Sequence, residues 1–390
     1  MKTRDLVLAI RSGLENLPTG YSVEEFVRER LRELTGKDDE ALFKDIARRT
    51  LGLGPLEDLL VDPDISDIMV NGPNQVYVER RGRLELTPIH FTDVEELTNA
   101  IYRIMQMSGR RINFSRPVED ARLPDGSRVN AVIPPATEVP LLTIRKFVQK
   151  TFSTQDLLST GSITEEMIWL FRAVLQGKAN IIVAGATGSG KTTFLRWLTT
   201  FIPSHERIVI IEDTRELNIE HPHVVSLEGS ANADIHRLTM NALRMRPDRI
   251  IIGEVRGAEA FELLQAMGTG HEGSLTTVHA NYTPREAVHR LVRAMIRIGG
   301  MTAEELEYMV TETVDLFIFL RRLQDGTRRV VRVSEIERTR DGQAERDIYI
   351  FRGGKHHFVQ PISRRLQEKL LENLDGSLPD VPAFGRGGVS

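Results

Sequence analysis

The chain has 390 residues and a net charge of −4, with 51 Lys and Arg residues against 55 Asp and Glu residues. This length predicts two domains, and the even spread of basic residues disfavours nucleic acid as the main partner. The absence of cysteine excludes disulfides and cysteine-ligated zinc, and apolar runs such as residues 316–320 are too short to span a bilayer.

The first stretch, residues 1–51, is predicted to form an N-terminal helical arm. Ser22 and Glu25 match a capping box, in which each side chain bonds the backbone of the other at a helix start. Gly36 ends that helix, and a second helical pattern covers residues 38–51. We expect this arm to tune docking rather than catalysis, because it lies outside the motifs that carry chemistry.

Residues 52–148 are predicted to form a smaller N-terminal α+β domain. Strand patterns cover residues 65–72, 75–79, 83–86 and 142–147, with a hairpin turn at Arg81-Gly82, and an amphipathic helix covers residues 94–107. The stretch at residues 109–130 is basic and rich in turn residues. For its arginines, a solvated sheet face is as good an interpretation as a binding role.

Residues 149–161 carry few signals and are predicted to be the interdomain linker. From residue 162 to residue 352, helical patterns alternate with short β-branched runs, which is typical of a parallel sheet with crossover helices. The expected strands cover residues 180–184, 207–211, 249–254, 273–279, 314–320 and 329–333. Residues 353–390 are predicted to hold one helix, at residues 364–374, and a flexible tail.

The strand at residues 180–184 runs into a glycine-rich loop, Gly185-Ala186-Thr187-Gly188-Ser189-Gly190-Lys191-Thr192, and a helical pattern follows. This is the context of a phosphate-binding loop, in which backbone N–H groups and the helix dipole face the phosphates. Lys191 would reach the β- and γ-phosphates of ATP, and the Thr192 hydroxyl would bind Mg²⁺. The predicted nucleotide contacts are Gly185, Thr187, Gly188, Ser189, Gly190, Lys191, Thr192 and Thr193.

Carboxylates and a histidine follow other strands at the sheet edge where ligands of open parallel sheets bind. Glu254 is the best candidate to orient or deprotonate the water that attacks the γ-phosphate, with Glu212 as the second. Glu254 and Asp213 could also hold Mg²⁺, and His279 could sense the γ-phosphate. For each of these residues, a helix cap, a surface charge or a structural histidine is the alternative.

Four stretches of this domain resemble the motifs of the type II/IV secretion superfamily of ATPases. They are the Walker A loop at residues 185–192, the Asp box at 211–214, the Walker B stretch at 243–257 and the His box at 269–281. Residues 52–57, 66–73 and 120–128 are similar to the CpaF/TadA branch, which drives tight-adherence (Flp-type) pili. The resemblance covers roughly residues 50–335.

The resemblance implies an α/β fold, with a RecA-like P-loop ATPase domain joined to the N-terminal domain by a mobile linker and assembled as a hexameric ring. It also implies that ATP lies between the two domains and that arginines of the N-terminal domain reach its phosphates. By position in the pattern these are Arg128 and Arg145, with Arg122 as a third candidate. A guanidinium suits the charge that spreads over the transferring phosphoryl group.

The chain departs from the branch in two ways. Arg215 follows the Asp box where a small or apolar residue is usual, so its role is open. The four-cysteine zinc module of many classical type II secretion and pilus-assembly ATPases is missing, which disfavours those subfamilies.

The resemblance implies an Mg²⁺-dependent ATPase that powers assembly or retraction of a tight-adherence pilus, or drives a related secretion machine. The alternatives are a conjugation or type IV secretion ATPase of the same superfamily, a RecA-type nucleic-acid motor, and an inactive scaffold that binds ATP. Net charge −4 and 6% aromatic residues disfavour the nucleic-acid motor, which needs a basic lining or a stacking platform. Intact Lys191, Thr192, Glu254 and His279 disfavour the inactive scaffold.

We expect a cytoplasmic protein without membrane insertion, because the start of the chain lacks a signal-peptide pattern. The resemblance implies that it is a homohexamer. Such a motor can move an extracellular fibre only by binding an integral membrane platform protein. We therefore expect it at the inner face of the membrane. No basic amphipathic helix marks a lipid contact, and no direct contact with nucleic acid is expected.

Overall fold

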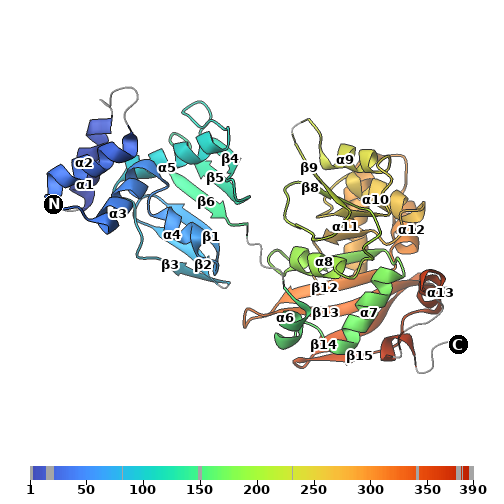
Figure 1. Cartoon of the computed structure of the whole chain (residues 1–390). Coiled ribbons are helices and arrows are strands. Elements are labelled where there is room, and N and C mark those ends of the chain that lie inside the picture. Colours follow the sequence, from blue (N-terminus) through green and yellow to red (C-terminus); the bar gives the residue numbers. More distant parts are fainter. Residues whose placement is uncertain are drawn as a thin grey trace. The chain divides into compact units, whose positions relative to one another are not determined.

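The computed structural model describes residues 3–14, 22–80, 82–147, 152–230, 232–339, 342–374, 379 and 381–385. The chain divides into two units, Met1–Gln149 and Lys150–Ser390 (Figure 1), and each is described by itself. The following lie outside the described residues: residue 148 of the predicted N-terminal domain, residues 149–151 of the predicted linker, Arg81 of the predicted hairpin turn and residues 386–390 of the predicted tail. Within these described ranges, every helix is too short or too polar to cross a membrane.

The first unit begins with the helices α1 (Thr3–Leu14), α2 (Val23–Thr35) and α3 (Glu40–Leu51). Ser22 caps α2, as the sequence predicts, by accepting a hydrogen bond from the backbone N–H of Glu25. Gly36 ends the helix in the left-handed conformation, with a φ of 66°. The apolar faces of these helices share a small core whose innermost members are Val7, Ile10, Val27 and Ile46.

An antiparallel sheet in the order β3-β2-β1-β6-β5-β4 forms the body of the first unit. Its strands are β1 (Ile65–Asn71), β2 (Val76–Arg80), β3 (Arg83–Leu86), β4 (Val118–Arg122), β5 (Arg128–Val132) and β6 (Leu141–Arg145). The helices α4 (Leu56–Val61) and α5 (Val94–Met107) pack with the apolar face of this sheet. The β4–β5 hairpin is not among the strands that the sequence predicts, because polar side chains cover its other face and interrupt the apolar pattern.

The second unit is built on a sheet in the order β15-β14-β13-β12-β7-β11-β10-β8-β9. The part from β12 to β9 is parallel, and the part from β13 to β15 is antiparallel. The strands are β7 (Ile181–Gly185), β8 (Ile208–Glu212), β9 (Val224–Glu228), β10 (Arg249–Ile252), β11 (Leu275–Val278), β12 (Leu316–Arg322), β13 (Arg328–Thr339), β14 (Gly342–Arg352) and β15 (Lys355–Phe358). The strands predicted after residue 162 are therefore confirmed, and β9, β14 and β15 are additions.

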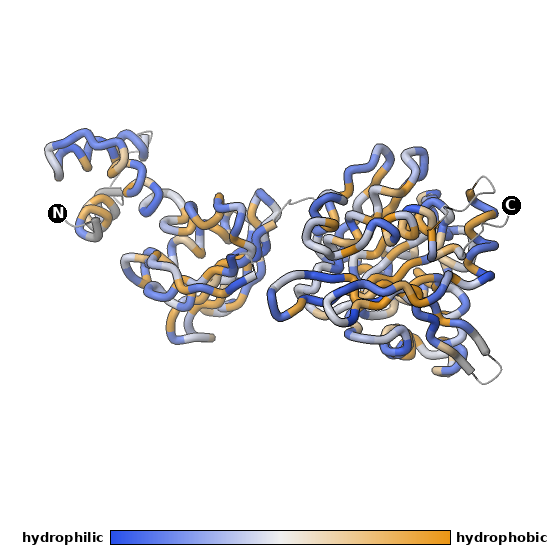
Figure 2. The backbone as a smooth tube through the Cα atoms, turned by 90° about the horizontal axis from the view of Figure 1, so that it is seen from below, coloured by the Kyte–Doolittle hydropathy of each residue, from blue (hydrophilic) through white to orange (hydrophobic). Residues whose placement is uncertain are grey.

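Helices cover both faces of the parallel part of this sheet. As a result, β7, β8, β10 and β11 are buried along their whole length. One core contains Ile181 and Val183 with residues of α6 (Thr154–Ser159), α7 (Glu165–Gln176), α8 (Lys191–Thr199), α13 (Arg364–Asn373) and η2 (Pro382–Phe384). The opposite core contains Ile182 and Ala184 with residues of α10 (Glu259–Gly268), α11 (Pro284–Met295) and α12 (Ala303–Thr313). Figure 2 shows the apolar segments running through the interior of each unit. The helix α9 (Ile235–Ala242) and the turn η1 (Ile296–Ile298) complete the unit.

Two predicted boundaries differ from the structure. Residues 154–161, assigned to the linker, include α6, whose Leu157 is in the core and whose Thr154 hydroxyl accepts a hydrogen bond from Trp197. Phe384, assigned to the flexible tail, is only 4% exposed and packs in the same core. Both short segments hold too few apolar residues to show a period in the sequence, and burial comes from elements distant along the chain.

Candidate active site

The loop between β7 and α8 has the conformation that its glycines permit. Gly188 and Gly190 adopt positive φ values of 72° and 94°, which residues with a Cβ avoid. At Gly185 a Cβ atom would lie 2.5 Å from the carbonyl oxygen of Leu320, so a larger residue would displace β12. The predicted strand, loop and helix are therefore present, and the N-terminus of α8 opens onto the loop.

Lys191 lies at the first turn of α8 and folds back onto this loop. Its side chain is largely buried, and its Nζ donates hydrogen bonds to the carbonyl oxygens of Gly185 and Ala186, at 3.0 and 3.1 Å. Burial lowers the pKa of Lys191, and the nearby charge of Glu254 opposes that shift. The buried Oγ of Ser189 has no hydrogen-bond partner among the described residues. These donors fit the phosphate groups of a nucleotide.

Glu254 follows β10 and lies at the centre of a polar cluster. Oε2 of Glu254 accepts a hydrogen bond from Arg256 at 2.6 Å, and Nε2 of His279 lies 2.7 Å from Oε1. The His279 contact lacks hydrogen-bond alignment, so the buried Oε1 atom has no hydrogen-bond partner within the described part of the chain. Arg256 also lies 3.7 Å from Asp213, which follows β8. The cluster thus brings together three residues that the sequence placed at separate strand ends, and adds Arg256.

His279 follows β11, and its surroundings favour the neutral form of its imidazole. Burial lowers its pKa most, and the positive charge of Lys191 lowers it further, while Glu254 opposes the shift. A neutral imidazole can donate through one ring nitrogen and accept through the other. His279 is thus suited to contact a phosphate or a water next to Glu254 without adding a fixed charge.

Glu212 has a different environment from Glu254. It is 5% exposed, and its Oε1 accepts hydrogen bonds from the backbone N–H groups of Glu216 and Leu217, at 3.0 and 3.1 Å. A Cβ at Gly253 would lie 2.9 Å from its Cγ, so Gly253 lets the two strand ends approach. One oxygen of Glu212 therefore orders the loop after β8, and its catalytic role stays a prediction. Asp213 is 65% exposed at its side chain.

Arg328, at the start of β13, is a site residue that the sequence analysis missed. Its Nε donates a hydrogen bond to the carbonyl oxygen of Gly188 at 3.1 Å. Its side chain also lies over Gly190, where a Cβ would meet Cδ of Arg328 at 2.9 Å. Arg328 is 140 residues from Gly188 along the chain, so only the paired strands β7, β12 and β13 bring it to the loop.

Arg215, the departure from the expected pattern, contacts the neighbouring edge strand. Its guanidinium donates to the carbonyl oxygen of Ser226 at 3.3 Å and lies 3.7 Å from Glu228, both in β9. Arg215 therefore helps to attach the loop after β8 to the edge of the sheet.

Arg122, Arg128 and Arg145 form one row across the sheet of the first unit. Arg122 is paired with Arg128 between β4 and β5, and Arg128 with Arg145 between β5 and β6. Directly opposed residues of antiparallel strands point to the same face, so the row is a basic stripe. Arg145 ends the stripe with a 3.0 Å hydrogen bond to Asp67 of β1. Contact between these arginines and a nucleotide stays a prediction, because the two units are described separately.

The chain is similar to several known proteins. The chain is 32% identical over 297 residues to "Conjugal transfer protein TrbB" of Rhizobium radiobacter, covering 74% of this chain and 89% of the relative. It is 35% identical over 276 residues to "Type IV secretion system protein VirB11" of Brucella suis biovar 1, covering 62% and 76%. The fold matches the X-ray structure of the Yersinia pseudotuberculosis ATPase DotB with a TM-score of 0.54 at 20% identity, covering 78% of this chain and 81% of that chain.

A family model described as "Type II/IV secretion system protein" matches residues 49–353, which include the first sheet, the second sheet except β15, and every residue of the site above. The chain belongs to the type II/IV secretion system protein family.

Proposed function

We propose that this protein hydrolyses ATP in an Mg²⁺-dependent reaction. The observation that carries the proposal is Glu254, a carboxylate with one buried, unbonded oxygen, next to Lys191 and held between His279 and Arg256. Hydrolysis requires a water aligned on the γ-phosphate by a carboxylate, and a cation that balances the charge of the phosphates.

The loop residues bind and orient the phosphates in this proposal. Backbone N–H groups at the N-terminus of α8 would face the β-phosphate, and Nζ of Lys191 would exchange its two carbonyl partners for phosphate oxygens. Thr192, Glu254 and Asp213 would hold Mg²⁺. When bound, the ion would neutralise part of the charge of the phosphates.

Glu254 would orient the attacking water and take up its proton at Oε1. Arg256 holds the other carboxylate oxygen, so the carboxylate has a fixed direction. His279, neutral at physiological pH, would contact the γ-phosphate beside it. Arg128 and Arg145 would stabilise the transferring phosphoryl group if the two units close over ATP.

The test is phosphate release by the full chain with Mg²⁺-ATP. Glu254→Gln keeps the shape of the side chain and removes the basic oxygen, so turnover should fall by about 10²- to 10⁴-fold while ATP still binds. Lys191→Ala should abolish binding or turnover. Glu368→Gln, an exposed change on α13, is the matched control and should leave turnover unchanged. Wild-type turnover by Glu254→Gln would assign the base to another carboxylate, with Glu212 the first candidate.

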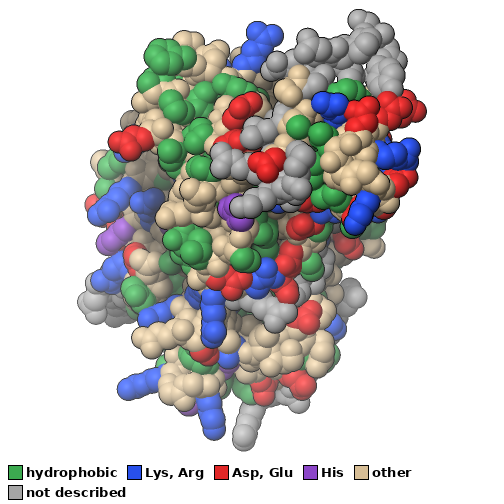
Figure 3. Space-filling model, turned by 90° about the vertical axis from the view of Figure 1, so that its left-hand side faces the viewer, with side chains coloured by type: hydrophobic (Ala, Val, Ile, Leu, Met, Phe, Trp, Pro, Cys, Tyr) green, Lys and Arg blue, Asp and Glu red, His purple; other side chains and the backbone are tan. Residues whose placement is uncertain are grey.

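We further propose that the hydrolysis drives a secretion machine as a homohexameric ring on the inner face of the membrane. The relatives named for conjugal transfer and type IV secretion favour the conjugation or type IV secretion reading. A tight-adherence pilus motor is the second candidate, supported by residues 66–73 and 120–128, which resemble that branch. Both basic and acidic side chains lie on the face drawn in Figure 3, and the net charge of −4 disfavours nucleic acid as the main partner.

Deletion of the gene separates the two candidates. Loss of DNA or protein transfer to a recipient cell supports the conjugation or type IV secretion motor, and loss of surface pili with intact transfer supports the pilus motor. An integral membrane platform protein is the expected partner in either case. Membrane association that persists after deletion of the platform proteins would contradict that partner.

A further inference from the structure

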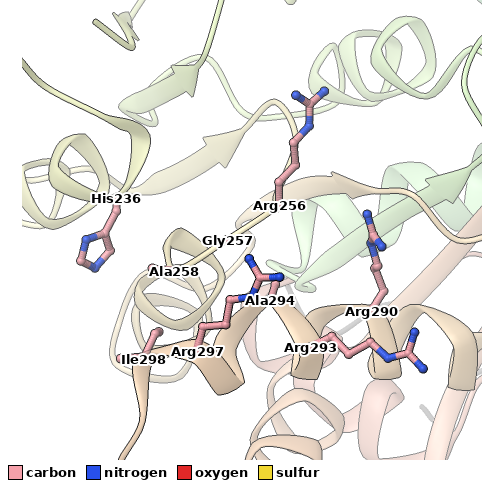
Figure 4. Close-up of a pocket in the computed structure, with 9 residues that line it drawn as sticks. All are labelled: His236, Arg256, Gly257, Ala258, Arg290, Arg293, Ala294, Arg297 and Ile298. Carbon is pink, nitrogen blue, oxygen red and sulfur yellow. The ribbon is translucent and has the colours of Figure 1, made fainter. Parts of the chain in front are cut away.

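A cavity of about 590 Å³ lies beside the active site, between α9, the loop after β10, and α11 with η1. The side chains that line it include one histidine and four arginines, His236, Arg256, Arg290, Arg293 and Arg297 (Figure 4). Arg256 is shared with the active site, where it binds Glu254. The other arginines have no part in the proposed hydrolysis.

The spacing of residues along α11 and η1 explains why these arginines lie on one face. Val288, Leu291 and Met295 are buried in the core below the helix, whereas Arg290, Arg293 and Arg297 are exposed. Positions three and four apart share one face of a helix, and the turn η1 continues that face to Arg297. Figure 4 shows all three side chains projecting from this one segment, with Arg297 directed towards the loop at Gly257.

The acidic groups near the cavity do not neutralise this face. Glu262 lies 3.4 Å from His236, and Glu254 and Asp213 contact Arg256. Arg290, Arg293 and Arg297 have no hydrogen bond or ion pair with any side chain in the part of the chain that the structure describes. Three like charges on one wall repel one another unless an anion binds between them.

We propose that this cavity is a second oxyanion site, which takes a phosphate group at the arginines of α11 and η1. A guanidinium offers a rigid fork of N–H donors that matches phosphate oxygens, and several guanidiniums on one wall can share one phosphate. The phosphate has two possible sources, which are inorganic phosphate and the phosphate groups of a nucleotide. Arg256 belongs to both sites, because it lines the cavity and its guanidinium holds Glu254 in the candidate active site.

Calorimetry on the full chain tests the site. The Lys191→Ala background weakens the P-loop, and inorganic phosphate, pyrophosphate and ADP are titrated separately at constant ionic strength. Saturable binding is expected in that background, and Arg293→Gln with Arg297→Gln should weaken it by about tenfold or more, because each removes charge-assisted hydrogen bonds. Both arginines are exposed, so the fold is retained. Arg244→Gln, an exposed change in the same unit, is the matched control and should have no effect.

The titrations also identify the source. Tighter binding of inorganic phosphate than of ADP assigns the site to the free ion, and the reverse order assigns it to a nucleotide. No saturable binding of any of the three anions, or binding that the Arg293 and Arg297 substitutions leave unchanged, overturns the proposal. A change in oligomer mass on these substitutions, without any anion binding, also overturns it and assigns the arginines to a contact between copies of the chain.

Discussion

The buried pair Arg249–Glu206 predicts a large loss of stability when one partner is removed. Arg249 begins β10 and is 0% exposed, and its guanidinium donates to Glu206, just before β8, and to the carbonyl oxygen of Gly273, just before β11. These contacts join the starts of three strands whose opposite ends carry the site. Glu206→Ala leaves a guanidinium buried without its counter-charge.

Breaking a buried pair on one side costs about 3–5 kcal/mol of unfolding free energy. At 1.36 kcal/mol for each factor of ten, this raises the unfolded fraction by about 150- to 5,000-fold. Screening does little to reduce the cost, because the side chain of Glu206 is only 4% exposed. The double variant Glu206→Leu with Arg249→Met removes both charges. Its unfolding free energy should therefore fall by less than that of Glu206→Ala.

Urea unfolding followed by tryptophan fluorescence measures this effect. The two tryptophans of the chain, Trp169 and Trp197, lie in α7 and α8, so their emission reports the second unit. Glu368→Ala removes an exposed pair with Arg364 and should change the unfolding free energy by less than about 1 kcal/mol. The buried-pair explanation would be wrong if Glu206→Ala lowered the unfolding free energy by less than about 1 kcal/mol. It would also be wrong if the double variant lost as much unfolding free energy as Glu206→Ala.

The other predictions concern nucleotide binding, pH and catalysis. Arg328→Ala removes the hydrogen bond to the P-loop and should weaken ADP binding by about two- to tenfold, measured by calorimetry, with Arg352→Ala unchanged. Burial raises the pKa of Glu335 to about 7, so the folded state binds more protons than the unfolded state and stability falls by about 3 kcal/mol as pH rises from about 4.5 to about 7. Glu335→Gln should abolish that slope in urea unfolding at each pH. Arg128→Ala should lower kcat by about 10³-fold and affect ADP affinity less, and equal losses in both would contradict a transition-state role.

The fold of the second unit could be predicted largely because its strands are buried on both faces. Runs such as residues 181–184 and 208–211 are continuously apolar and β-branched, so they stand out in the sequence. The β4–β5 hairpin has one polar face, and its arginines hide the alternation. α6 and Phe384 belong to the core of the second unit because elements distant along the chain bury them. A local sequence pattern does not show such burial.

Some residues of the candidate site could likewise be predicted from the sequence, and others could not. Lys191, Glu254 and His279 follow strands, and their placement at one sheet edge could be predicted from topology. Arg256 and Arg328 could not be assigned, because their roles depend on which backbone or carboxylate lies opposite them in space. The use of Glu212 as an acceptor for backbone N–H groups depends likewise on the path of the loop after β8.

Two hydrogen bonds tie the end of β10 to the end of β11. Thr277 Oγ1 donates to the carbonyl oxygen of Gly253 at 2.7 Å, and the N–H of Val255 donates to the carbonyl oxygen of Thr277 at 3.0 Å. Glu254 sits between these two bonds on one strand end, and His279 lies two residues beyond Thr277 on the other. The two strand ends thus form one stiff body. In the proposed ATPase, a shift of His279 on loss of the γ-phosphate would carry Glu254 with it, so that phosphate detection and water alignment would form a single mechanical step.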